Sequence, residues 1–200
     1  EHRAKEKATW GTSSNFEAPS DTMANADAQY VHTYYSRRFG DLMVVRGKYV
    51  TAPDTRSGVP ISSPGYDTQL YTMCTYNIWA GSAIDCMLDT EMTVDDDGYY
   101  TLVISDEGNK PTTLEQEQAT WIDMGDYLDG QLTYRYVYRD NPFSMAIADG
   151  VMGKPVSADM QPYVPIATHC EKSVFESGGW KACFAKSNID SRAYLLSAAE

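Results

Sequence analysis

Two cysteine-bearing segments lie close together near the middle of the chain: Gln69-Leu70-Tyr71-Thr72-Met73-Cys74-Thr75-Tyr76 and Ala83-Ile84-Asp85-Cys86-Met87-Leu88. The residues between them, 77–82, are mostly small or turn-forming. This order predicts an antiparallel hairpin in which Cys74 and Cys86 face each other across the ladder. A disulfide at that position would hold the register, so we place this hairpin at the centre of the fold.

The four cysteines fall as two close pairs. Four cysteines allow three connectivities, and we choose the sequential one, Cys74–Cys86 and Cys170–Cys183. Neither pair has the Cys-x-x-Cys spacing of many zinc sites, and the three histidines are scattered. Two disulfides indicate an oxidising compartment. Because the chain begins at Glu1, we expect a removed leader and a secreted protein, located outside the cell or in the cell envelope.

Composition and charge narrow the range of partners. The chain has 200 residues, of which 42% are hydrophobic, enough for one domain with a core. Its net charge of -12 argues against binding to nucleic acid or to anionic membrane surfaces. No apolar run approaches the roughly 20 residues of a membrane-spanning helix. Other protein surfaces, including a second copy of the chain, and neutral glycans remain open.

Residues 1–20 are polar and lack a regular period, which predicts an extended N-terminal arm. The arm contains two large aromatic residues, Trp10 and Phe16, which are expected to anchor it on a surface. That surface is either the chain's own domain or a neighbouring subunit. Apolar residues then recur near helical spacing, with Ser20 or Asp21 able to cap a helix. We expect a helix over 21–38.

Short strand-like segments dominate the remainder. Residues 42–50, 99–105, 118–123 and 131–139 are rich in β-branched and aromatic types, and turn-forming residues separate them. A short helix is expected near 143–152. Many short strands with frequent turns predict a mainly β fold, an antiparallel β-sandwich or jelly roll, that forms a single domain over 21–200. From residue 163 onward the core candidates are Phe175, Trp180 and Phe184.

Several short motifs occur along the chain: Asn25-Ala26-Asp27-Ala28-Gln29-Tyr30, Val44-Val45-Arg46-Gly47-Lys48, Ala52-Pro53-Asp54-Thr55, Tyr71-Thr72-Met73-Cys74, Cys86, Asp97-Gly98-Tyr99-Tyr100-Thr101, Trp121 and the segment from Tyr134-Arg135 to Asn141-Pro142. Together they resemble a family of exported bacterial proteins without a characterised function. They are similar to the C-terminal jelly-roll-like domain of a two-domain family, over roughly residues 20–185. The resemblance implies a β-sandwich in the cell envelope or outside the cell, and it supplies no catalytic residues.

An acidic cluster that includes Asp95, Asp96 and Asp97 suggests a calcium site, because calcium prefers several oxygen ligands from one short loop. The EF-hand template fails here, since with Gly98 at its sixth place the first and twelfth places hold Thr93 and Ile104. A solvated hairpin turn is the favoured interpretation and a calcium loop of another type is the alternative, so we expect no required cofactor. The sequence also lacks Gly-x-Ser-x-Gly and the common phosphate-binding glycine loops. It therefore nominates no catalytic residue.

Tyrosine is abundant, with 15 copies. Tyr134, Tyr136 and Tyr138 alternate along one strand and share a face. A tyrosine combines a large apolar ring with a polar tip, which suits a sandwich core, a protein interface or a sugar-binding face. The sequence does not decide among these three.

Three hypotheses of function follow. The first is an extracellular structural protein that assembles into an oligomer or filament by exchanging its arm between subunits. The second is a secreted carbohydrate- or small-ligand-binding sandwich that uses the tyrosine face. The third is a hydrolase with a carboxylate pair that the sequence does not identify. No Asn-x-Ser/Thr sequon occurs, whereas Thr12-Ser13-Ser14, Ser62-Ser63 and Thr112-Thr113 could accept O-linked sugar.

Overall fold

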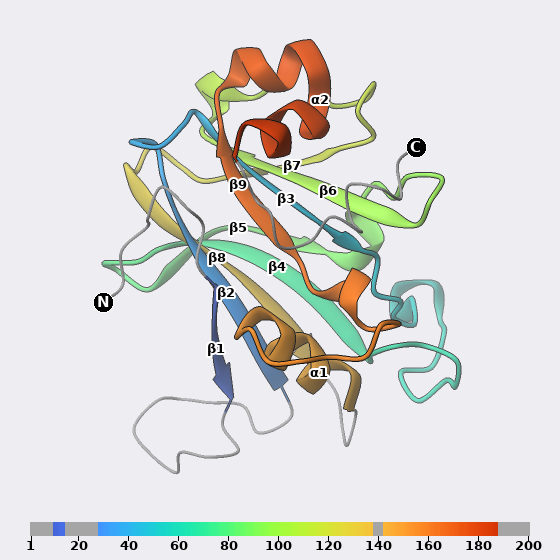
Figure 1. Cartoon of the computed structure of the whole chain (residues 1–200). Coiled ribbons are helices and arrows are strands. Elements are labelled where there is room, and N and C mark those ends of the chain that lie inside the picture. Colours follow the sequence, from blue (N-terminus) through green and yellow to red (C-terminus); the bar gives the residue numbers. More distant parts are fainter. Residues whose placement is uncertain (1–9, 15–27, 138–141, 188–200) are drawn as a thin grey trace.

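The computed structural model describes residues 10–14, 28–137 and 142–187 (Figure 1). Its strands are β1 (Trp10–Ser14), β2 (Ala28–Ser36), β3 (Leu42–Lys48), β4 (Leu70–Asn77), β5 (Ser82–Leu88), β6 (Tyr99–Ser105), β7 (Thr120–Asp123), β8 (Asp129–Val137) and β9 (Ile166–Cys170). The helices are α1 (Pro142–Val151) and α2 (Lys172–Lys186), and short 3-10 turns lie at η1 (Thr55–Ser57), η2 (Asp89–Glu91), η3 (Glu107–Asn109) and η4 (Gln161–Tyr163). The fold is mainly β, as predicted.

The strands form two sheets that pack face to face as a β-sandwich (Figure 1). Sheet A has the order β1-β2-β8-β4-β5, and sheet B has the order β7-β6-β3-β9. All pairs between these strands are antiparallel except β6–β7, which is parallel. The prediction of an antiparallel sandwich is therefore confirmed for the architecture, with one parallel pair at the edge of sheet B.

Both predicted disulfides are confirmed. Cys74 lies directly opposite Cys86 in the β4–β5 hairpin, and the two are bonded. Cys170, the last residue of β9, is bonded to Cys183 of α2. The first bridge holds the register of the hairpin, and the second ties a helix to the end of a strand. In the chain-entropy model, closing a loop of this length stabilises the folded state by about 3 kcal/mol.

The predicted helix over 21–38 is wrong where the structure describes it, because residues 28–36 form strand β2. Val31, Thr33 and Tyr35 are almost fully buried. They alternate with three partly exposed residues, Tyr30, His32 and Tyr34. This two-residue period matches a strand with one buried face. β-branched and aromatic residues also favour strands. The proposed caps, Ser20 and Asp21, lie outside the described residues.

The core is divided into two clusters by sheet B. The first fills the space between the sheets and includes Tyr71, Tyr134 and Leu102. The second lies on the outer face of sheet B, where α2 covers it (Figure 1), and includes Val44 and Phe175. Strand β3 is buried on both faces because it contributes to both clusters. Helix α1 packs Ile147, Ala148 and Val151 into the first cluster.

The predicted short helix near 143–152 is confirmed as α1, but the sequence did not reveal α2. Its segment contains Gly178 and Gly179, whose backbone angles are not helical and divide the helix at a kink. Glycine disfavours helices, so the helical signal is weak here. The expected core residues Phe175, Trp180 and Phe184 are nevertheless buried. Of the helices among the described residues, none is long and apolar enough to cross a membrane.

Candidate functional surfaces

The predicted arm contains an edge strand of sheet A. Strand β1 pairs antiparallel with β2 of the same chain, with Trp10 opposite Thr33. The ring of Trp10 packs against the inter-sheet core, with its centroid 5.9 Å from that of Tyr134. Residues 10–14 therefore dock on their own domain in this structure. The second predicted anchor, Phe16, lies outside the described residues.

The tyrosine row is not an exposed face. Tyr134 and Tyr136 are both 0% exposed. They stack on Tyr71, with ring centroids 5.8 and 5.0 Å from its centroid. Strand β8 lies in the middle of sheet A, and these residues point towards sheet B, which covers them. Of the three alternatives that the sequence left open, the sandwich core holds for these two residues; Tyr138 lies outside the described part of the chain.

Buried tyrosine hydroxyls meet between the sheets. The hydroxyl of Tyr100, on sheet B, donates a hydrogen bond of 3.2 Å to the hydroxyl of Tyr134, on sheet A. Burial raises the pKa of Tyr100 to about 12, although the hydrogen bond with Tyr134 lowers it. Burial also raises the pKa of Tyr71, Tyr134 and Tyr136 well above the ordinary value. The core therefore favours the neutral form of all four rings.

These shifts predict alkaline unfolding. The pKa values are raised in the folded state, so the stability that the four tyrosines contribute is fully present below pH 10. It should be lost as the pH rises through the pKa of Tyr100, at about 12. In an alkaline titration, phenolate absorbance from these rings should appear only together with the loss of native circular dichroism. Ionisation of all 15 tyrosines with native circular dichroism retained would contradict this.

The acidic turn contributes Asp95 to an ion pair with the buried side chain of Arg46. Asp95 accepts a 2.6 Å hydrogen bond from the guanidinium of Arg46 through Oδ2. Its other carboxylate oxygen accepts from the backbone N–H groups of Asp97 and Tyr99. The side chains of Asp96 and Asp97 are exposed. Over the described ranges, no three His, Cys, Asp or Glu side chains are grouped so that they could hold a metal ion.

Arg46 is the buried charge that sequence reasoning missed. The residue is 2% exposed and lies between two aromatic rings, 3.9 Å from the ring centroid of Trp180 and 5.0 Å from that of Tyr99. Its guanidinium also donates to the hydroxyl of Thr101 at 2.9 Å. The rings and Asp95 together compensate for removing the cation from water. The sequence signal that could have revealed this buried charge is the position of Arg46 directly after the apolar residues of β3.

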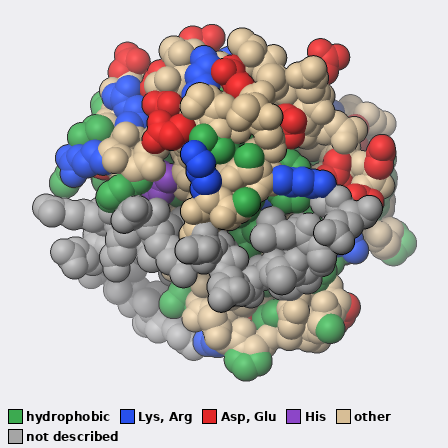
Figure 2. Space-filling view, turned by 45° about the horizontal axis from the view of Figure 1, so that its top comes forward, with side chains coloured by type: hydrophobic (Ala, Val, Ile, Leu, Met, Phe, Trp, Pro, Cys, Tyr) green, Lys and Arg blue, Asp and Glu red, His purple; other side chains and the backbone are tan. Residues whose placement is uncertain are grey.

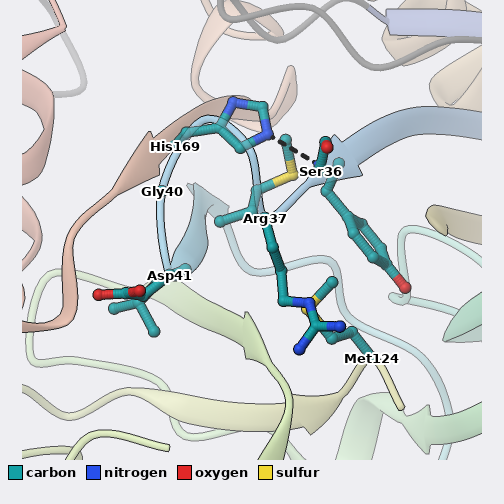
Figure 3. Close-up of a pocket in the computed structure, with 9 residues that line it drawn as sticks. Ser36, Arg37, Gly40, Asp41, Met124 and His169 are labelled. Atoms are coloured by element: carbon teal, nitrogen blue, oxygen red, sulfur yellow. Dashed lines mark hydrogen bonds between the residues drawn. The ribbon is translucent and has the colours of Figure 1, made fainter. Parts of the chain in front are cut away.

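A small hollow lies at the end of the sandwich, where β2 turns into β3 (Figure 3). The backbone N–H of Ser36 donates to Nε2 of His169 at 3.2 Å, which joins the two sheets. Arg37 donates to Asp106 at 3.0 Å and to the backbone carbonyl of Asp126 at 2.8 Å. The hollow is too narrow to admit a water molecule. We therefore do not assign a substrate to it.

A carboxylate pair lies beside this hollow. Burial raises the pKa of Glu171, and the negative charge of Asp41 raises this pKa further. The carboxylate of Asp41 points away from the guanidinium of Arg37 (Figure 3) and accepts a 3.1 Å hydrogen bond from the N–H of Lys172. Asp41 therefore caps the first turn of α2, as carboxylates commonly do. This cap is a sufficient structural reason for the position of Asp41 beside Glu171.

Comparisons with known proteins give two weak matches among solved structures. No protein family matches the chain, and no curated protein matches it. An uncharacterised protein from Burkholderia cenocepacia is 16% identical, with a TM-score of 0.46, over 66% of this chain and 32% of its own. A protein from Vibrio parahaemolyticus is 14% identical, with a TM-score of 0.35, over 68% of this chain and 27% of its own. The chain thus spans about a third of these bacterial proteins or less, and they indicate no function for it.

Proposed function

We propose that this protein is an extracellular structural protein that assembles into an oligomer or filament by exchanging strand β1 between subunits. The observation that carries the proposal is the position of β1 at the edge of sheet A, where it packs Trp10 against the core. Edge strands present unpaired backbone groups to which another chain can add a strand. Strand β1 supplies that edge with both hydrogen bonds and an aromatic anchor.

The connection between β1 and β2 permits exchange. Antiparallel neighbours are usually joined by a turn of two to five residues. Here residues 15–27 separate the two strands along the chain. An extended segment of that length could span up to about 45 Å. The pairing of β1 with β2 is therefore not held by a tight turn, and the same contact can form within one chain or between two.

Exchange would also allow growth. The donated strand and the accepting edge of β2 are different surfaces of one subunit, so the contact is head-to-tail and need not close on itself. A tether gives the pairing within one chain an effective concentration on the order of millimolar. Exchange between chains is therefore favoured at high local concentration. The two disulfides support an extracellular or cell-envelope location, where such concentrations and oxidising conditions occur together.

A cross-link can distinguish the two arrangements. Ser13 and Tyr30 are register partners in β1 and β2, so the double variant Ser13→Cys/Tyr30→Cys should form a disulfide between the strands. If the proposal holds, oxidation of concentrated protein gives a ladder of covalent multimers on a non-reducing gel. The matched control is Tyr34→Cys/Gln131→Cys, a pair inside sheet A that is expected to give cross-linked monomers. Monomers alone from both variants, at every concentration up to millimolar, would overturn the proposal.

A further inference from the structure

Exposed apolar side chains gather at one end of sheet A. Trp79 is 79% exposed, Tyr127 is 47% exposed and Leu128 is 42% exposed. Trp79 lies at the tip of the β4–β5 hairpin, and the other two lie in the loop between β7 and β8. The register pairs Tyr76 with Gln131, which places the tip and the loop at the same end of adjacent strands (Figure 1). We call these three side chains the aromatic platform.

The hairpin holds Trp79 in a defined position. The side-chain oxygen of Asn77 accepts hydrogen bonds from the N–H groups of Trp79 and Ala80, at 2.9 and 3.2 Å. The N–H of Gly81 donates to the backbone carbonyl of Asn77 at 2.9 Å. The Cys74–Cys86 disulfide crosses the same hairpin just below the tip. The braced turn therefore holds Trp79 in contact with solvent. An indole buried in the core would stabilise the fold more than this exposed one does.

The second loop is braced as well. Arg37 donates from its backbone N–H to the carbonyl of Leu128 at 2.9 Å, and from its side chain to the carbonyl of Asp126. Gly125 lets this loop approach strand β5, because the side chains of Ile84, on β5, and of Tyr127 both lie within 3.5 Å of the position that its Cβ would occupy. A preorganised surface loses little conformational entropy when it binds. Exposed apolar groups held in this way commonly mark a recognition surface.

The charges around the platform select the kind of ligand. Residues 77–84 and 125–129 include two aspartates, Asp126 and Asp129, and the two arginines beside this loop are paired, Arg37 with Asp106 and Arg38 with Asp129. With a net charge of -12 for the chain, anionic polymers and anionic lipids would be repelled. On the face shown in Figure 2, acidic and basic side chains are interspersed. A cage for an organic cation would enclose the indole of Trp79, which is instead largely open to solvent.

We propose that the aromatic platform binds a neutral glycan. The apolar C–H face of a pyranose ring stacks on an open aromatic ring, and Trp79 and Tyr127 offer such rings on neighbouring loops. The exposed carboxylate of Asp126 is placed to accept hydrogen bonds from sugar hydroxyls, which gives orientation to an otherwise apolar contact. This site is separate from the buried Tyr134 and Tyr136, and it does not depend on strand exchange.

The test is affinity gel electrophoresis of the whole chain in gels that contain laminarin, hydroxyethylcellulose or galactomannan. We expect at least one of these neutral polymers to retard the protein. The variant Trp79→Ala should lose retardation, and Tyr127→Ala should weaken binding roughly tenfold, the loss of one good stacking contact. The control is Tyr66→Ala, which removes an exposed tyrosine from another loop. All three variants should keep native circular dichroism, because these side chains lie outside both core clusters.

Each other outcome overturns the proposal. Migration of the intact chain unchanged by all three polymers would do so, as would retardation that Trp79→Ala leaves intact. Sedimentation velocity provides the second readout. If Trp79→Ala changes the oligomeric state and leaves glycan retention unaltered, the platform is a contact between protein chains. Retention lost equally in Tyr66→Ala would show that the polymers bind exposed aromatic side chains without selectivity.

Discussion

The variant Asp95→Asn is expected to lower the free energy of unfolding by about 3 kcal/mol or more. Asparagine can still accept the backbone hydrogen bonds of the turn, but it carries no charge to pair with Arg46. The guanidinium of Arg46 would then be a buried cation held by two rings and one hydroxyl. Urea unfolding followed by circular dichroism measures the loss.

Neighbouring residues supply the controls for this variant. Asp96→Asn and Asp97→Asn change the same turn at exposed side chains and should alter the free energy of unfolding by no more than about 0.5 kcal/mol. Adding Arg46→Met to Asp95→Asn should recover part of the loss, because a buried pair replaced by apolar groups is often neutral. Equal effects at all three aspartates would instead indicate a property of the whole turn, such as bound calcium. Chelation by EDTA would separate that case.

The variant Gly130→Ala is expected to lower the free energy of unfolding by about 3 kcal/mol, the upper end of the range for overpacking. Gly130 lies opposite Tyr35 in the β2–β8 ladder, and the tyrosine ring covers the place of the missing side chain. A methyl group on Gly130 would lie 2.3 Å from ring atoms of Tyr35. Tyr35 is 1% exposed, so its ring cannot move aside without disturbing the core. Thermal and urea unfolding measure the effect.

A double variant separates the clash from any other cost of alanine. Tyr35→Ala removes the ring and should itself be destabilising, by about 3–5 kcal/mol. Adding Gly130→Ala to it should cost little further, because the two changes act on one contact. If the two losses simply add, the explanation by ring contact is wrong. The same arrangement recurs in sheet B between Gly47 and Tyr100, where the corresponding distance is 2.9 Å. We expect a smaller loss for Gly47→Ala.

Part of this structure could be predicted from local pattern. The spacing of Cys74 and Cys86 around a turn indicated the hairpin, and the clean alternation over 131–139 indicated β8. Both signals depend on near neighbours in the chain, which report the period of a strand directly. The segment 28–36 misled because its apolar positions fit two periods, and pairing with β1 and β8 selects the strand.

The sites depended on contacts between residues distant in the chain. Nothing local distinguishes the tyrosines of β8 from surface tyrosines, since burial follows from the position of that strand under sheet B. Likewise, Arg46 and Asp95 are 49 residues apart, and their pairing exists because β3 and β6 are neighbours.

The sequence alone therefore specified the disulfides and a two-layer β fold, because local spacing and residue type encode them. Which face of each strand meets solvent, and which loops come together around Trp79, followed from the packing of the sheets. A strand has two faces, and its own residues do not state which partner will cover either one.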